Sequence, residues 1–97
     1  MLHLIAENSL QASVVERIAT GDDVILQGGV VWSVLIGHSD NQRLIDLIDR
    51  GCKLYALQDV LSAGGITEEQ LLPGVQAIDY AAFVDLTVKN PVIHTWS

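Results

Sequence analysis

Short apolar segments alternate with segments of helical periodicity along this chain. The apolar segments are His3–Ala6, Asp23–Gln27, Lys53–Leu57 and Val75–Ile78. Most of their apolar residues are consecutive, which indicates strands buried on both faces, as in a parallel sheet covered by helices. Right-handed crossovers then leave few topologies. The order predicts an α/β fold with one domain over residues 1–97, of Rossmann or flavodoxin-like type, with a mostly parallel sheet of four or five strands.

The segments between these strands predict short helices. Ser9 is expected to cap the first one, and glycines punctuate the ends of the helices. The residues expected to face inward are Leu10, Val14, Val15 and Ile18 in the first helix, Val30–Ile36 in a buried helical turn or two, and Leu44, Ile45, Leu47 and Ile48 in the next helix. A further short helix is expected from about Asp59 to Gly64.

The last twenty residues predict a complete amphipathic helix followed by a short tail. Asp79 is placed to cap the helix N-terminus, and Ile78 and Phe83 are spaced as a hydrophobic staple. Helical spacing places Tyr80, Phe83, Val84 and Val88 on one face, and Lys89, Asn90 and Pro91 supply stop signals. Trp96 follows this end, and its indole needs a pocket in this subunit or in a neighbouring one.

Composition limits the classes of partner. The net charge is −7 and the five cations are scattered, so direct nucleic-acid binding is not expected. The chain is 49% hydrophobic and only 18% charged, and excess apolar surface on a small domain favours oligomerisation. Its apolar segments are far below membrane-spanning length, and no secretory leader is recognised. We expect a soluble cytoplasmic protein without a membrane partner.

Ligands of parallel sheets gather at the carboxyl ends of the strands, which are here Ala6–Ser9, Gln27–Gly29, Leu57–Asp59 and Ile78–Tyr80. No His, Cys or Lys is found in these segments. Asp59 and Asp79 both precede helices and are interpreted as caps. Gly28 and Gly29 lack the spacing of a phosphate-binding loop and are interpreted as a tight strand-to-helix turn. We therefore predict no catalytic residue and no cofactor site.

The single cysteine and the three histidines do not form a site either. Cys52 lies at the start of the third strand, opposite the end where a site would form, and burial as a small apolar residue is the favoured interpretation. Arg50 and Lys53 beside it leave a reactive thiolate as the alternative. His3, His38 and His94 have no partner at metal-ligand spacing, so no metal is expected.

The segments together match a known family in order. They are Met1–His3, Ser9, Val24–Val30, Leu54–Leu61, Ile78–Val88 and Trp96. On these segments the chain resembles the DsrH/TusB family, the B-type subunits of the DsrEFH/TusBCD sulfur-relay complexes. Leu10, Gly28 and Gly64 stand where that family commonly has a proline, an acidic residue and an arginine.

The resemblance implies a small subunit that assembles with a C-type (TusC/DsrF-like) and a D-type (TusD/DsrE-like) paralogue. In TusBCD that assembly passes persulfide sulfur toward 2-thiolation of the tRNA wobble uridine, whereas DsrEFH belongs to sulfur oxidation. The active cysteine of the D-type paralogue ends the strand equivalent to Lys53–Leu57, so its place here is about Leu57 or Gln58. Neither side chain can form a persulfide, which needs a thiolate.

We therefore expect a non-catalytic structural subunit of a sulfur-relay complex, with tRNA thiolation as the favoured pathway and sulfur oxidation as the alternative. A stand-alone relay protein that uses Cys52 as persulfide acceptor is a second alternative. A homo-oligomer with a small ligand at Gly28–Gly29 is a third. The candidate partner interface comprises Trp32, Tyr80, Phe83 and Trp96, because aromatic residues are enriched among interface hot spots.

Overall fold

A computed structural model describes residues 1–7 and 9–96 and shows a five-stranded sheet in the order β4-β3-β2-β1-β5. Its strands are β1 (Leu2–Ile5), β2 (Asp23–Leu26), β3 (Lys53–Leu57), β4 (Val75–Ile78) and β5 (Ile93–Trp96). All neighbouring strands pair in parallel, which confirms the predicted α/β fold. Asn8, within the predicted loop Ala6–Ser9, lies outside the described residues.

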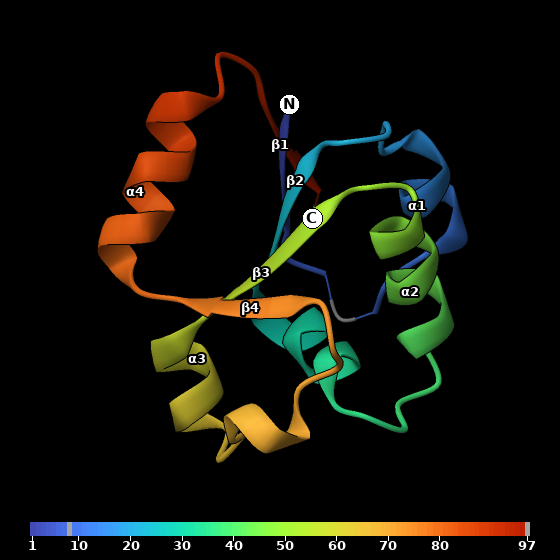
Figure 1. The fold of residues 1–97 in the computed structure, drawn as a ribbon, viewed down its shortest axis with the longest axis vertical. Helices are drawn as coiled ribbons and strands as arrows, with labels where there is room; N and C mark the ends of the chain where they lie inside the picture. Colours follow the sequence, from blue (N-terminus) through green and yellow to red (C-terminus); the bar gives the residue numbers. More distant parts are fainter. Residues whose placement is uncertain (8, 97) are drawn as a thin grey trace.

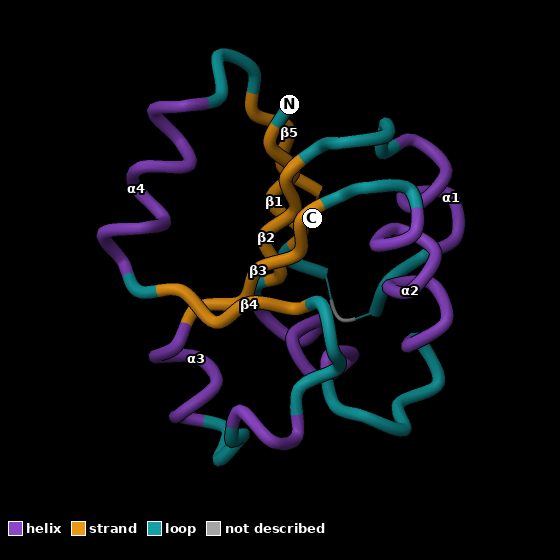
Figure 2. Tube along the Cα trace, in the orientation of Figure 1, coloured by secondary structure: helices purple, strands orange, loops and turns teal. Residues whose placement is uncertain are grey.

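Helices cover the two faces of the sheet unequally. The α-helices are α1 (Ala12–Arg17), α2 (Asn41–Asp49), α3 (Gln58–Ala63) and α4 (Tyr80–Lys89), and the 3₁₀ helices are η1 (Gly28–Val34) and η2 (Glu68–Gln70). In Figure 1, α4 stands alone on one side of the sheet, with α1 and α2 on the other. Figure 2 shows how strongly the sheet twists, so that β4 crosses the direction of the other strands.

The larger apolar core fills the face covered by α1, α2 and η1. Ile5, Leu26 and Leu54 of the sheet pack there with Leu44 and Leu47 of α2, and all five are almost completely buried. The inward residues predicted for the first and third helical segments fall in this core or against it. The face under α4 holds a smaller cluster formed by Leu2, Ile25, Tyr55, Ile78 and Leu86.

Helix α4 begins as the sequence predicted, but its apolar residues Tyr80, Val84 and Val88 are exposed to solvent. The Asp79 carboxylate accepts a 2.8 Å hydrogen bond from the Ala82 N–H, and Phe83 packs against the cluster that contains Ile78. The face that helical spacing assigns to Tyr80, Phe83, Val84 and Val88 is largely turned to solvent, because Tyr80 is 72% exposed and Val88 is 80% exposed. The helix carries apolar residues on both sides, so periodicity alone does not decide which side meets the sheet.

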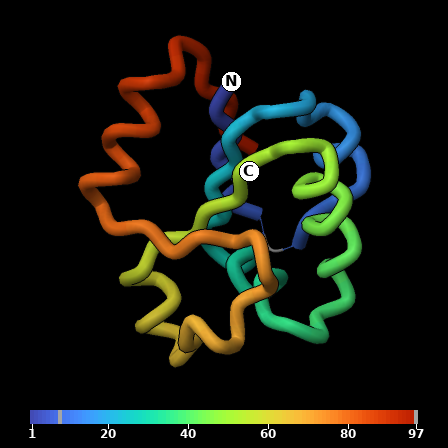
Figure 3. Tube along the Cα trace, in the orientation of Figure 1, coloured from blue at the N-terminus to red at the C-terminus, as the bar shows by residue number. Residues whose placement is uncertain are grey.

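Two further predictions need correction. The first helix begins after Gln11 rather than after Ser9, which is exposed. Ile93–Trp96, predicted as part of a short tail, form β5, because β1 would otherwise be an edge strand and offers them its unpaired backbone. Figure 3 shows the last segment beside the first one, although they are the opposite ends of the chain.

Candidate functional site

The carboxyl end of β3 runs directly into α3. Leu57 is the residue before the helix and Gln58 is its first residue, exposed to solvent. Gln58 lines a cavity of about 190 Å³ together with Leu61, Ile66 and Ala77. Of the two positions that the resemblance gives for a carrier thiol, Leu57 and Gln58, the second lies at a solvent-accessible hollow, and neither side chain is a thiol.

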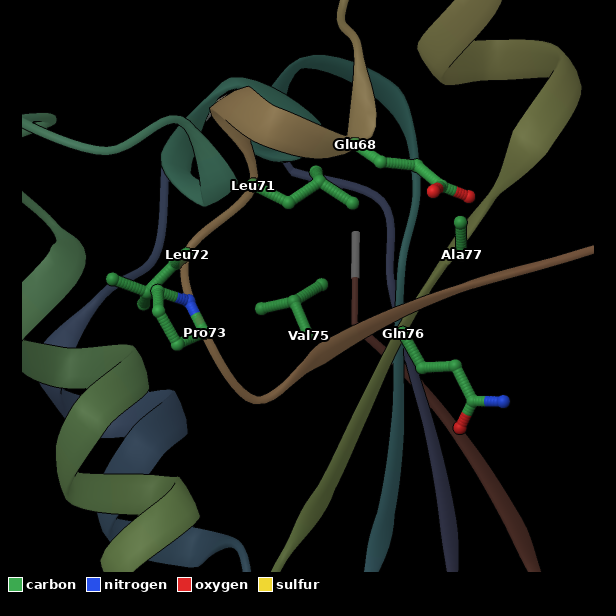
Figure 4. A pocket seen from close by; sticks show the side chains of 7 residues that line it. All are labelled: Glu68, Leu71, Leu72, Pro73, Val75, Gln76 and Ala77. Carbon is green, nitrogen blue, oxygen red and sulfur yellow. The ribbon is translucent and has the colours of Figure 1, made fainter.

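A larger cavity of about 330 Å³ continues from this hollow along β4. The two cavities share Glu68, Leu71 and Ala77. In Figure 4 the side chains of Val75 and Ala77 project from one side of β4 and that of Gln76 from the other. Five of the seven residues that line the larger cavity are apolar, and the ionisable one is Glu68.

The segment that forms the wall of these cavities is fixed by backbone hydrogen bonds. Leu72 N–H donates to Val34 O at 2.7 Å, and Ile36 N–H donates to Gln70 O at 3.0 Å. Gly74 then brings the chain against α2 with a φ of +101°, where a Cβ would lie 2.7 Å from Cδ1 of Ile48. The hollow along β4 is therefore preformed rather than created by a loose loop.

Gly28 and Gly29 form the tight strand-to-helix turn that the sequence predicted. Gly28 has a φ of +61°, and a Cβ there would lie 3.4 Å from the Ala6 carbonyl oxygen. The Val30 N–H donates to Glu7 O at 2.7 Å, so this amide is already used within the fold. Nothing in this geometry distinguishes the turn as an anion site.

Cys52 is buried at the amino end of β3, far from the hollow at the carboxyl end. Its side chain is 5% exposed, and Sγ donates to the Ala19 carbonyl oxygen at 3.3 Å. A thiol enclosed in this way cannot attack a persulfide without local unfolding. Among residues 1–7 and 9–96, no group of three or more His, Cys, Asp or Glu side chains is arranged to hold a metal ion.

A polar network that the sequence did not predict joins β1 to the last residue of β5 and to the turn before β2. His3 is 2% exposed, and its Nε2 is 2.8 Å from Asp22 Oδ2 while its Nδ1 is 3.1 Å from the indole nitrogen of Trp96. An indole N–H can only donate a hydrogen bond, so Nδ1 of His3 accepts it. The Nε2–H of His3 then donates a hydrogen bond to the Asp22 carboxylate. Both ring nitrogens are therefore engaged, and His3 has none left to serve a nucleophile as a base.

The same network determines the ionisation of Asp22. Burial raises the pKa of this carboxyl group, but hydrogen bonds from His3, from the Ala19 N–H and from the amino group of Met1 outweigh it. The net effect is a pKa below the usual value of 3.8. These contacts join β1, β5 and the turn before β2. We therefore interpret the network as structural.

The four aromatic residues predicted as a partner interface lie in three separate places. Trp32 is 45% exposed, and its ring lies against Gly64, the residue that follows α3. A Cβ added to Gly64 would be 3.1 Å from the Trp32 ring. Tyr80 stacks on the half-buried Phe83 at 6.1 Å between ring centroids on α4. Trp96 is half-buried beside His3. The structure thus unites only Tyr80 and Phe83.

Comparison with known proteins gives a consistent picture. The model of the "DsrH like protein" family matches residues 5–92. The chain is 36% identical to Protein TusB of Photorhabdus laumondii, over 99% of this chain and all of that protein. It is also 36% identical to Protein TusB of Escherichia coli K12, over 88% of this chain and 85% of that protein.

Solved structures with the same fold are more distant in sequence. The YchN protein of E. coli superposes with a TM-score of 0.78 at 14% identity, covering 98% of this chain and 97% of that one. A Methanobacterium thermoautotrophicum protein of unknown function, MTH1491, gives 0.76 at 14% identity, covering 97% and 95%. No helix in the described part of the chain is long and apolar enough to cross a bilayer. Sequence and family model together place this chain in the DsrH/TusB family.

Proposed function

We propose that this protein is a non-catalytic subunit of a sulfur-relay complex that supports 2-thiolation of the tRNA wobble uridine. The observation that carries the proposal is the side chain at the carboxyl end of β3. Leu57 and Gln58 stand where the resemblance places the carrier thiol, Gln58 lies at a solvent-accessible hollow, and the only cysteine is buried at the opposite end of the strand.

The chemistry of sulfur relay makes this substitution decisive. A thiolate attacks the outer sulfur of a persulfide, the sulfur–sulfur bond breaks, and the donor leaves as a thiolate. Neither an alkyl group nor an amide is a sulfur nucleophile, so Leu57 and Gln58 cannot take part in that exchange. Sulfur must therefore travel on a thiol of another subunit, while this chain contributes contacts.

The expected partners are the C-type and D-type paralogues. Tyr80, which is 72% exposed, and Trp32, which is 45% exposed, offer the largest accessible aromatic surfaces for them. The ring of Phe83 stacks on that of Tyr80. Trp96 is the last residue of the edge strand β5, which pairs with β1. Trp32, Tyr80, Phe83 and Trp96 thus stay our proposed interface residues. Homo-oligomers are expected only when the partners are absent.

Co-expression with the two paralogues tests the proposal. Native mass spectrometry should show one complex that contains all three chains. A persulfide-charged cysteine desulfurase is then added, and the intact mass of each subunit is measured. We expect added sulfur on the D-type subunit and none on this chain, with wild type and Cys52→Ser giving the same result.

Two outcomes would contradict the proposal. Failure to bind either paralogue would remove the structural role, and a sulfur adduct on wild type that disappears in Cys52→Ser would make this chain a carrier. The pathway is decided in cells by replacing the gene and measuring 2-thiouridine in tRNA. Unchanged 2-thiouridine with impaired sulfur oxidation would assign the chain to a DsrEFH-type complex instead.

A further inference from the structure

The β4 edge of the sheet is open and could pair with a further strand. β4 pairs with β3 alone, so alternate backbone N–H and C=O groups of Val75–Ile78 face away from the sheet. Within the described residues, the only other backbone hydrogen bond made by this strand is from Val75 N–H to Leu72 O. The strand itself contains no Lys or Pro, the residues that commonly guard an edge.

Cavities lie on both faces of this edge strand. On the face of Val75 and Ala77 are the two joined cavities of about 330 and 190 Å³. On the face of Ile78, a third cavity of about 250 Å³ opens between β4 and α4, lined in part by Tyr55 and Leu86. A strand added to β4 would place successive side chains on opposite faces, and thus over cavities on both sides.

Charge identifies the kind of segment that fits. Residues 54–88 contain five carboxylates and no Lys, Arg or His, so they supply −5 of the net charge of −7. They include most of β3, all of α3, η2 and β4, and α4 up to the residue before Lys89, its last residue. Glu68 lines both joined cavities, and the one cation of the third cavity, Lys89, lies 3.6 Å from the Asp23 carboxylate. A basic segment is attracted to this surface.

The same charge argues against a second copy of this chain as the occupant. Two copies joined through β4 would bring two sets of five carboxylates together, and like charges at an interface are unfavourable. We propose that β4 binds an extended segment of a different protein as a sixth strand, in which apolar side chains alternate with Lys or Arg. The inference does not depend on the sulfur-relay function, because it rests on this edge, its cavities and its charge.

Two short synthetic peptides, acetylated and amidated, test the proposal. In one, valine and lysine alternate, and in the other, valine and glutamate alternate. Binding to the full-length protein is measured by calorimetry, and the location is found by amide hydrogen exchange. The lysine peptide should bind at least about tenfold more tightly than the glutamate peptide. It should also slow exchange at outward-facing amides of Val75–Ile78.

Charge reversal at one position supplies the matched control. Glu68→Lys should weaken binding of the lysine peptide by about tenfold and favour the glutamate peptide. Glu69→Lys makes the same change at a neighbouring exposed residue that does not line the cavities, so it should leave the preference in place. Ala77→Leu, which fills the joined cavities without changing charge, should weaken both peptides. The proposal is overturned if neither peptide binds, if both bind equally, if protection falls outside β4, or if both charge variants behave alike.

Discussion

The indole N–H of Trp96 donates a 3.1 Å hydrogen bond to Nδ1 of His3, joining residues 93 positions apart in the chain. This bond lies across the pairing of β5 with β1, in which Trp96 is opposite Ile5. Trp96, which follows the last predicted helix in the sequence, therefore belongs to the sheet and helps to attach its edge strand β5 to β1.

Trp96→Phe keeps a ring at this position but removes the donor. His3 Nδ1 would be left without its partner in a side chain that is 2% exposed, so the free energy of unfolding should fall by about 1–3 kcal/mol. Urea unfolding followed by circular dichroism measures the change. Thr95→Val, at an exposed neighbour on the same strand, should change stability by less than about 0.5 kcal/mol. Equal effects of the two substitutions would contradict the role of the hydrogen bond.

The lowered pKa of Asp22 predicts a loss of stability in acid. Because the folded-state pKa lies below the unfolded value, the ionised carboxylate stabilises the fold fully above that value of 3.8. The contribution is lost as the pH falls through the folded-state pKa. Asp22→Asn should therefore be less stable than wild type at neutral pH and should lose less stability on acidification below about pH 4. Parallel acid-dependence curves of the two proteins would show that Asp22 is not the group responsible.

Gly74→Ala should destabilise the fold more than Gly65→Ala. Both glycines have positive φ, +101° and +73°, so each substitution introduces backbone strain. Only at Gly74 would the new Cβ also collide with a neighbour, Cδ1 of Ile48 at 2.7 Å. We expect a further loss of about 1–3 kcal/mol at Gly74, measured as the difference in free energy of unfolding between the variants. No difference would indicate that the Pro73–Gly74 turn moves freely away from α2.

The thiol of Cys52 should be inert in the folded protein. Its burial and its contact with the Ala19 carbonyl oxygen leave no path for a thiol reagent. Ellman's reagent should react slowly in native buffer, at a rate set by opening of the structure, and at once in concentrated urea. Rapid stoichiometric reaction in native buffer would show that Cys52 is accessible.

Tyr80→Ser should separate assembly from folding. The side chain is 72% exposed, so stability of the isolated subunit should change by less than about 0.5 kcal/mol. Affinity for the paralogous subunits, measured by titration, should fall by about tenfold or more if Tyr80 is an interface hot spot. Thr20→Ala, at an exposed residue near α1, serves as the control and should leave affinity unchanged. Unaltered affinity of Tyr80→Ser would remove this part of α4 from the interface.

Local signals predicted most of the fold. The four apolar segments became β1 to β4, and the Asp79 cap is present with its hydrogen bond to Ala82. These features depend on residues close in sequence. The strand β5 was missed because Ile93–Trp96 includes polar His94 and Thr95 and follows helix stop signals. Its strand conformation comes from the free edge of β1, which no local pattern reveals.

The site was less predictable than the fold. The absence of a thiol at Leu57 and Gln58 was evident from the sequence, as was the position of Cys52 at the other end of β3. The hollow along β4 was not, because its wall is positioned by the hydrogen bond from Leu72 N–H to Val34 O, between segments distant in sequence. Nor did periodicity reveal that Tyr80 and Val88 are exposed to solvent, which depends on how α4 packs against the sheet.

The pairing of the first strand with the last one also bears on the order of folding. Contacts between Leu2 and Ile93, or between His3 and Trp96, close the longest loops that the described chain makes, and loop closure is costly in entropy. β5 is largely exposed, so it recovers little burial in return. We therefore expect β2 and β3 to assemble first and β5 to dock late. Native-state fluctuations should open this strand while the centre of the sheet stays intact.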